Sequence, residues 1–304
     1  MKRISYPIAI LLLIFLGSMV AAEDWNLRDH ITLEKVMVQC HRGAGALLPE
    51  NSVEAFEMAW QWNTIPELDL RMTKDGIIVA FHDNNFKRIL PDATEEFQQK
   101  GIADLTLEEV KKLDIGIWKG KEFEGQRVPT LAETLELMKK DPKRMIYIDI
   151  KNVDFEQLAR GTKGFHPRLI LASTKYEEIR LWKKLAPTSM TLYWMGGSEE
   201  ALEKRFVELR KTDFADITQL QIHVRIDQNG KFSFSPSEEF LKKVGHRTTQ
   251  AWRYISNATV GMSRRRSFQA VDGPRLCQLC DRLPRHNHDC HPRILCGKEV
   301  RAIC

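Results

Sequence analysis

Short apolar runs typical of buried strands alternate with segments of helical periodicity between residue 36 and about residue 225. The strand-like runs cover residues 36–40, 67–71, 77–81, 145–150, 168–172, 190–195 and 219–226. Apolar residues at helical spacing lie between several of these runs, over residues 52–62, 106–113, 131–140 and 175–185. Strands separated by helices predict an α/β domain with a mostly parallel sheet, either open or closed into a barrel. No internal repeat or Gly/Ser-rich linker interrupts the region, so no second domain is expected before residue 246.

Polar residues that can perform acid–base or metal chemistry lie at the ends of four of these runs. They are His41 and Arg42 after the first run, Glu67 and Asp69 in the second, His82 and Asp83 after the third, and Asp149 and Lys151 in the fourth. Residues two apart in a strand point to the same side of the sheet. In a (β/α)8 barrel, the C-terminal strand ends meet at one face. The pattern therefore predicts that these side chains gather at one place.

The motifs around these residues resemble those of one enzyme family. They are His41-Arg42-Gly43, Pro49-Glu50-Asn51-Ser52, Glu67-Leu68-Asp69, Thr73-Lys74-Asp75-Gly76, His82-Asp83, Val128-Pro129-Thr130-Leu131 and Ile148-Asp149-Ile150-Lys151. In order and spacing, they resemble the glycerophosphodiester phosphodiesterase family over roughly residues 36 to 240. The resemblance implies a TIM (β/α)8 barrel and metal-dependent hydrolysis of a small glycerophosphodiester to an alcohol and glycerol 3-phosphate.

The resemblance also implies one divalent cation, Mg²⁺ or Ca²⁺, held by Glu67, Asp69 and Asp149. Carboxylate oxygens are the ligands that these hard cations prefer. Asp149 departs from the family, which usually has Glu at this position. Its side chain is one methylene shorter, so it would reach less far, and it would bind the cation directly or through a water molecule.

The remaining site residues would contact the phosphate or move protons. By resemblance, Arg42 and Lys151 would add positive charge at the phosphate, and His41 and His82 would act as general acid and base. The sequence leaves open which histidine is the base in the first step. It also leaves open whether water or a substrate hydroxyl attacks the phosphorus.

Glu50 and Asn51 match the family motif but also read as the start of a helix, with Asn51 as a suitable N-cap. We therefore expect both to be supporting structure.

Two other functions fit the same residues. A phospholipase of the same superfamily would act on lipid phosphodiesters. A catalytically impaired relative would bind phosphodiesters without cleaving them, which Asp149 and the absence of closing-strand motifs favour. The intact pairs His41/His82 and Glu67/Asp69 count against impairment. The sequence does not indicate an oligomeric state.

The N-terminus has the layout of a secretory signal peptide over residues 1–22. Lys2 and Arg3 precede an apolar run from Ile8 to Leu16, and cleavage is expected after Ala22. The mature protein would then be exported, to the periplasm or the medium, without a stable membrane span. An uncleaved anchor is the alternative.

The composition changes after residue 246. Residues 1–246 carry 35 Lys and Arg against 37 Asp and Glu, whereas residues 247–304 carry 11 against 4. The basic charge is therefore confined to the tail, which has no recognisable nucleic-acid-binding module, so no nucleic-acid partner is expected. The composition of the whole chain, 43% hydrophobic and 29% charged, excludes a wholly disordered chain and a polytopic membrane protein.

The tail also lacks the closing-strand motifs of the family and contains five of the six cysteines. A shifted reading frame would produce such a change. The second interpretation is a zinc site built on Cys277-x₂-Cys280 and the histidines and cysteines that follow. The third is a disordered or disulfide-linked tail. We therefore divide the chain into a signal peptide, a barrel domain over residues 23–246 that is incomplete or atypical at its closing strands, and an atypical tail over residues 247–304.

Overall fold

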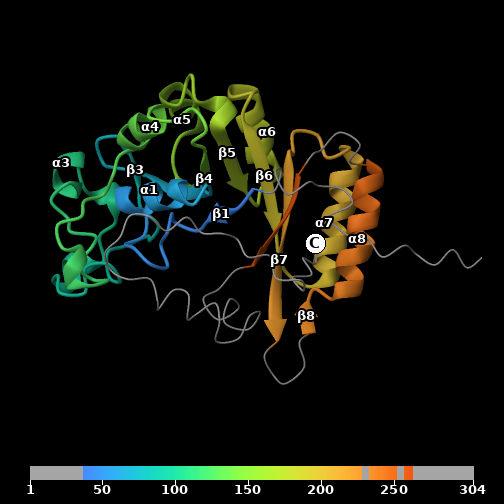
Figure 1. Ribbon diagram of the computed structural model, residues 1–304, viewed down its shortest axis with the longest axis horizontal. Coiled ribbons are helices and arrows are strands. Elements are labelled where there is room, and N and C mark those ends of the chain that lie inside the picture. Colours follow the sequence, from blue (N-terminus) through green and yellow to red (C-terminus); the bar gives the residue numbers. More distant parts are fainter. Residues whose placement is uncertain (1–36, 228–232, 252–256, 263–304) are drawn as a thin grey trace, which may run out of the picture.

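A parallel β-sheet forms the centre of the molecule (Figure 1). The computed structural model describes residues 37–227, 233–251 and 257–262. The parallel strands lie in the order β1 (Gln39–Cys40), β2 (Ile65–Met72), β4 (Ile146–Asn152), β5 (Leu169–Ser173), β6 (Met190–Met195), β7 (Gln219–Asp227) and β9 (Asn257–Met262). Two short strands pair antiparallel with this sheet, β3 (Ile78–Ala80) with β2 and β8 (Ser233–Ser235) with β7. The architecture is α/β, as the sequence predicts.

The sheet curves into part of a barrel. Nε2 of Gln39 in β1 donates a hydrogen bond to Oε1 of Gln219 in β7 at 3.3 Å, although four strands lie between β1 and β7 in the sheet order. Side chains of such distant strands meet only if the sheet curls around a common interior. This curvature brings the two ends of the sheet to face each other.

Helices connect the strands. The longer ones are α1 (Val53–Gln61), α4 (Leu131–Lys139), α5 (Phe155–Gly161), α6 (Tyr176–Leu185), α7 (Glu199–Lys211) and α8 (Glu238–Ala251). Short helices are α2 (Glu95–Gln98) and α3 (Leu107–Val110), with 3₁₀ turns at Ile102–Asp104, Lys121–Phe123 and His166–Arg168. Figure 1 shows α7 and α8 running alongside β7. Ser52 and Ser198 cap α1 and α7, and Thr130 forms a capping box with Glu133 at the start of α4.

Strand periodicity separates two apolar layers. Outward residues such as Leu68 and Leu70 are fully buried in one core with residues of the helices, among them Phe56 and Trp182. Inward residues form a second cluster in the barrel interior, which contains Ile65, Tyr147, Ile170, Ala172 and Leu192. Because Glu67 and Asp69 alternate with Leu68 and Leu70, they share the inward face with Ile65.

Trp182 is the largest fully buried side chain in the outer core, and its indole Nε1 donates to Ser189 Oγ at 2.8 Å. We expect Trp182→Ala to lower the free energy of unfolding by about 3–5 kcal/mol, because it leaves a large cavity and removes the hydrogen bond to Ser189. The neighbouring Leu181 is 43% exposed, so Leu181→Ala should change stability by only about 0.5 kcal/mol. Urea unfolding of both variants measures the difference. Equal effects would contradict the assignment of this layer as the core.

The segment between β3 and α4, residues 84–128, folds on its own small core, and we call it the insertion. Its buried apolar residues pack on Val79 and Phe81 and are Phe86, Ile89, Ile102, Leu105, Val110, Ile115 and Val128. Phe86 stacks on Phe97 and meets Phe81 edge-on. The insertion is therefore a packed structure rather than a loose loop.

The predicted strands and helices are all present, but one strand runs in an unexpected direction. The run at 77–81, expected to end at the common edge of a parallel sheet, forms β3 and pairs antiparallel with β2. The connection from Met72 to Ile78 is a tight turn in which Gly76 has φ +81°. A parallel connection needs a crossover of about a dozen residues. A turn as short as this one can therefore only form a hairpin.

Regular structure continues beyond residue 246. Helix α8 runs to Ala251, and β9 pairs in parallel with β7, although the sequence shows no clear strand pattern there. Residues 252–256 and 263–304 lie outside the described residues, so the reading-frame, zinc and disulfide interpretations of the tail stay predictions. The predicted signal peptide lies outside them as well. Among the helices that the structure describes, none combines the length and apolar character needed to cross a membrane.

Candidate active site

Three carboxylates gather on the inward face of β2 and β4. Candidate ligand oxygens of Glu67, Asp69 and Asp149 all lie within 4.8 Å of one another, and Asp69 pairs directly with Asp149 across the two strands. Glu67 is 8% exposed and Asp69 only 1%. Asp149 reaches the other two despite its shorter side chain, so the departure from Glu does not remove it from the cluster.

The three carboxylates repel one another in a site that excludes most water. Burial raises the pKa of Glu67 to about 8, and the charges of Asp69 and Asp149 add to the shift. Burial also raises the pKa of Asp149, against the opposing effect of Lys151. Such a cluster is stable only if it holds protons or cations. All the donors are oxygens, so the residues present fit a hard divalent cation.

Two cationic side chains adjoin the cluster. Nζ of Lys151 donates to Oδ2 of Asp149 at 2.8 Å and lies 3.1 Å from Oδ1 of Asp69. Although burial acts in the opposite direction, these two carboxylates raise the pKa of Lys151. Nε of Arg42 is buried 3.8 Å from Oδ2 of Asp69 and has no hydrogen-bond partner within the part of the chain that the structure describes. This donor is therefore available to an anion that enters the site.

A tight turn after β1 places His41 and Arg42. The backbone N–H of Arg42 donates to Oε2 of Glu67 at 3.0 Å, and Nε2 of His41 lies 3.7 Å from the same oxygen. Gly43 has φ +73°, and a Cβ there would lie 2.9 Å from the backbone of Ala55. Only glycine fits this close approach of the turn to α1. The side chain of His41 is 75% exposed. The surrounding protein nevertheless displaces part of its water, which lowers its pKa, and the charge of Arg42 lowers it further.

The β2–β3 hairpin brings His82 back to the carboxylates. The backbone N–H of Phe81 donates to the carbonyl of Asp69 at 2.8 Å, so the chain after β3 runs beside the middle of β2. Arg71 holds this turn, because its Nε and Nη2 donate to the carbonyl of His82 at 3.1 and 2.7 Å. His82 thus reaches the site through an antiparallel return and not from the end of a parallel strand.

Asp83 orients the imidazole of His82. Nδ1 of His82 lies 2.7 Å from Oδ1 of Asp83. Burial acts to raise the pKa of Asp83, but hydrogen bonds from His82 and Arg88 hold it well below its ordinary value. An ionised carboxylate can only accept a hydrogen bond, so Nδ1 carries the proton and Nε2 is the ring atom left for chemistry.

Asn51 has a different role from the predicted helix cap. Ser52 caps α1, accepting from the backbone N–H of Ala55 at 3.1 Å. The Asn51 side chain instead donates to Oδ2 of Asp69 at 2.8 Å and accepts from the Asp69 backbone N–H at 3.0 Å. Its φ of +56° turns the side chain toward β2. Asn51 therefore fixes one of the carboxylates of the cluster.

The structure brings together all seven predicted site residues: His41, Arg42, Glu67, Asp69, His82, Asp149 and Lys151. Arg71 and Arg88, which also contact the site, are not among the residues predicted from the sequence. Spacing in the sequence gives no signal for either, because each acts through a turn or through the insertion.

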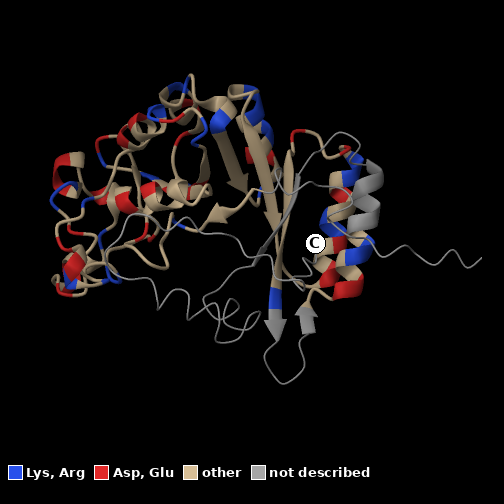
Figure 2. Cartoon of the chain, viewed as in Figure 1, with Lys and Arg blue, Asp and Glu red and all other residues tan. Residues whose placement is uncertain are grey.

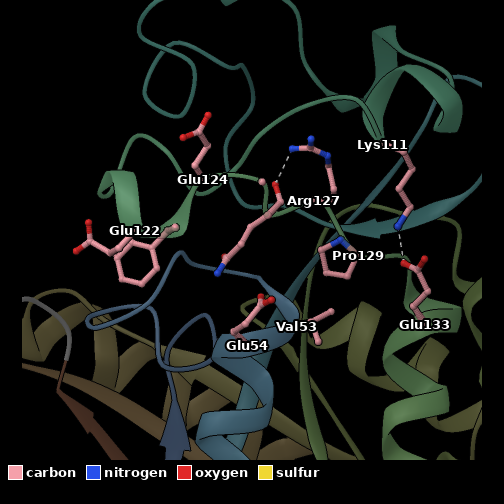
Figure 3. A pocket seen from close by; sticks show the side chains of 11 residues that line it. Val53, Glu54, Lys111, Glu122, Glu124, Arg127, Pro129 and Glu133 are labelled. Carbon is pink, nitrogen blue, oxygen red and sulfur yellow. Dashed lines mark hydrogen bonds and ion pairs between the residues drawn. The ribbon is translucent and has the colours of Figure 1, made fainter. Parts of the chain in front are cut away.

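The carboxylate cluster is separate from a pocket beside the insertion. A pocket of about 560 Å³ lies between the start of α1 and the insertion and contains none of the seven residues (Figure 3). Val53 and Glu54 line one side of it, and Lys111 pairs with Glu133 on the other. Figure 2 shows that charges of both signs are mixed over the helices and loops, whereas the strands are largely uncharged.

Comparisons with known proteins agree with the geometry. Residues 41–226 match the Glycerophosphoryl diester phosphodiesterase family. A glycerophosphodiester phosphodiesterase of Caldanaerobacter subterraneus subsp. tengcongensis is 38% identical over 162 residues, which cover 50% of this chain and 64% of that protein. A glycerophosphodiester phosphodiesterase of Bacillus subtilis is 33% identical over 143 residues, 44% of this chain and 45% of that protein. The chain thus spans less than two thirds of these curated relatives.

Solved structures show the same fold. A phosphodiesterase from Oleispira antarctica, solved in complex with the product sn-glycerol-3-phosphate, has a TM-score of 0.55 at 22% identity. The match covers 77% of this chain and 87% of the Oleispira antarctica chain. A glycerophosphodiester phosphodiesterase from Thermotoga maritima has a TM-score of 0.52 at 22% identity, over 77% of this chain and 89% of its own. The sheet is thus a TIM-barrel sheet that is incomplete over the described residues. The chain belongs to the glycerophosphoryl diester phosphodiesterase family.

Proposed function

We propose that this protein hydrolyses glycerophosphodiesters to an alcohol and glycerol 3-phosphate in a reaction that depends on one divalent cation. One observation carries the proposal: three carboxylates, two cationic side chains and two histidines lie together at one end of the sheet. Family membership and the names of the relatives support the same reaction.

Glu67, Asp69 and Asp149 would hold Mg²⁺ or Ca²⁺. When bound, the cation supplies Lewis-acid stabilisation of the charge that grows on the phosphoryl oxygens. Asn51 keeps Asp69 oriented through its two hydrogen bonds. Lys151 already neutralises part of the carboxylate charge in this site.

Arg42 and Lys151 would bind the phosphate of the substrate. The Nε of Arg42, which has no hydrogen-bond partner among the described residues, would supply one hydrogen bond to a phosphate oxygen, while Nη1 stays on Glu50 at 2.8 Å. Holding the guanidinium by Glu50 fixes where the free N–H points. A phosphodiester is thereby oriented before any bond changes.

His41 and His82 would move the protons. One imidazole takes the proton from the attacking water as the new P–O bond forms, or from a substrate hydroxyl in a first step whose cyclic phosphate product is then opened by water. The other donates a proton to the alkoxide as the P–O bond to the leaving alcohol breaks. The protons balance, because one is gained as another is released. Asp83 keeps the ring of His82 oriented through the bond at Nδ1.

The test is release of glycerol 3-phosphate from glycerophosphocholine by purified residues 23–304, with Mg²⁺, with Ca²⁺ and with a chelator. We expect release with a cation and none with the chelator. Lysophosphatidylcholine as a parallel substrate separates the phospholipase alternative. A folded protein that binds the cation but cleaves neither substrate would contradict the proposal and indicate an impaired relative.

The raised pKa of Glu67 predicts an unusual pH dependence of stability without a cation. The folded pKa of about 8 exceeds the ordinary 4.5 of the unfolded chain, so the folded protein holds a proton that the unfolded chain releases in this window. The free energy of unfolding should therefore fall as pH rises between about 4.5 and 8, and excess divalent cation should remove the fall. Urea unfolding in chelator at both ends of the window measures it. Glu67→Gln should lose this part of the slope, and an unchanged slope would contradict the prediction.

A further inference from the structure

The insertion contacts both segments that carry the histidines. Nη1 and Nη2 of Arg88 donate to Oε2 and Oε1 of Glu50 at 3.0 and 2.5 Å, and its Nε donates to Oδ2 of Asp83 at 2.7 Å. Glu50 belongs to the segment after β1, which carries His41, and Asp83 follows His82. Nζ of Lys119 also donates to the carbonyl of Gly45 in the first segment at 2.5 Å. One guanidinium therefore joins the two histidine segments.

The contacts form a continuous chain to the imidazole of His82. Arg88 donates to Oδ2 of Asp83, and Oδ1 of the same carboxylate accepts from His82 Nδ1. On the other side, Glu50 is only 8% exposed and also accepts from Arg42. Glu50, His82 and Asp83 lie close enough together to resemble a metal site. Two guanidinium groups on Glu50 make this cluster an ion-pair network instead.

Other residues of the insertion hold the guanidinium of Arg88 in place. The centroid of the Trp118 ring lies 5.1 Å from Cζ of Arg88, and the indole Nε1 of Trp118 donates to the carbonyl of Ile115 at 2.9 Å. Phe86 and Ile89, which flank Arg88 in sequence, are 0% and 2% exposed in the core of the insertion. A guanidinium stacked on an indole keeps a fixed plane, which suits its bidentate contact with a carboxylate.

We propose that Arg88, held by Trp118, is a positioning residue that fixes the Asp83 carboxylate and through it the Nε2 of His82. The proposal rests on the proposed function of the same site. It gives the insertion a part in catalysis: it sets how His82 lies relative to His41, without touching the substrate.

The first test compares the kinetics of Arg88→Ala with the unaltered chain. We expect kcat for glycerol 3-phosphate release to fall by about 10- to 100-fold, with KM and cation affinity within about twofold. Arg88→Lys should remain low in kcat, since a single ammonium cannot bridge Glu50 and Asp83 in the same way. Guanidinium ion at millimolar concentration should restore part of the activity of Arg88→Ala, and methylammonium should restore less.

Arg144 provides a matched control. Its Nη1 and Nη2 donate to both oxygens of Glu57 at 2.9 and 2.6 Å, and its Cζ lies 4.6 Å from the centroid of the Trp60 ring. This Arg–carboxylate–Trp arrangement precedes β4, at the opposite end of the strand from Asp149 and Lys151. Arg144→Ala should lower the melting temperature and leave kcat unchanged. An equal loss of kcat in both variants would overturn the proposal and show a purely structural effect.

Non-additivity tests the pathway through Asp83. If Arg88 acts through Asp83, the double variant Asp83→Asn/Arg88→Ala should have the same kcat as Asp83→Asn alone. Losses that multiply would overturn this pathway.

A readout independent of activity separates this proposal from the proposed function. In protein with ¹⁵N-labelled histidine, the His82 resonances, assigned with His82→Gln, should show the proton fixed on Nδ1. Arg88→Ala should give a mixture of tautomers or fast exchange of that proton, and Arg144→Ala should not. If this change occurs but the unaltered chain cleaves no glycerophosphodiester, the positioning role stands and the proposed function fails. An unchanged His82 spectrum in Arg88→Ala would overturn the positioning role.

Discussion

Replacing either histidine should lower kcat for glycerol 3-phosphate release by about 10²- to 10⁴-fold, the contribution expected of a positioned general acid or base. His82→Ala removes the imidazole that Asp83 orients at 2.7 Å. His41→Ala removes the one beside Glu67. Because both groups transfer protons and neither is expected to bind the ground state tightly, KM should change little.

His166 is the matched control for these variants. Its Nε2 lies 3.1 Å from the carbonyl of Ala159, and its ring meets Trp182 edge-on. It precedes β5, so it lies at the opposite end of the strands from the end that carries the site. His166→Ala should lower stability slightly and leave kcat within about twofold. If His41→Ala or His82→Ala kept nearly full activity, the acid–base assignment of that residue would be wrong.

Asp69→Asn should weaken divalent cation binding by at least about 100-fold and remove the activity that depends on it. The substitution keeps the shape of a residue that is 1% exposed, so the fold should persist while one anionic ligand is lost. Isothermal titration with Mg²⁺ and with Ca²⁺ measures the affinity directly. Glu57→Gln, which removes a carboxylate far from the cluster, should leave cation binding unchanged.

Asp149 distinguishes a working site from an impaired one. It lies within reach of the other two carboxylates, so we expect Asp149→Glu to retain cation binding and Asp149→Asn to weaken it. If the unaltered chain bound no cation and Asp149→Glu gained binding, the shorter side chain would be the cause of impairment. The same titration gives both results.

Much of the site can be predicted from the sequence because its residues lie in or next to strands. Glu67 and Asp69 face one side since side chains alternate along a strand, and the same rule places Asp149 and Lys151. Parallel pairing then brings Asp69 opposite Asp149. These relations depend on local geometry and strand order, both of which the pattern of apolar residues encodes.

His82 lies beside the carboxylates, as predicted, but it reaches them by a different route. The strand before it was expected to run parallel with its neighbours, whereas the hairpin turns it back along β2. The outcome was the same, because an antiparallel return also ends beside Asp69. Asn51 is the opposite case, since its type suggested a cap and its contact with Asp69 depends on a left-handed backbone that the sequence did not predict.

The alternation of strands and helices, the seven candidate residues and the family can be read from the sequence, since each depends on periodicity or on motifs along the chain. The packing of the folded chain is needed to show that Arg88 joins the two histidine segments, with Trp118 against its guanidinium. The same holds for the contact of Lys119 with the first of these segments and for the turn that Arg71 holds at His82. Spacing in sequence does not specify how an insertion with its own core packs against a barrel. That packing results from the shapes of two apolar surfaces, and it places these side chains beside the site.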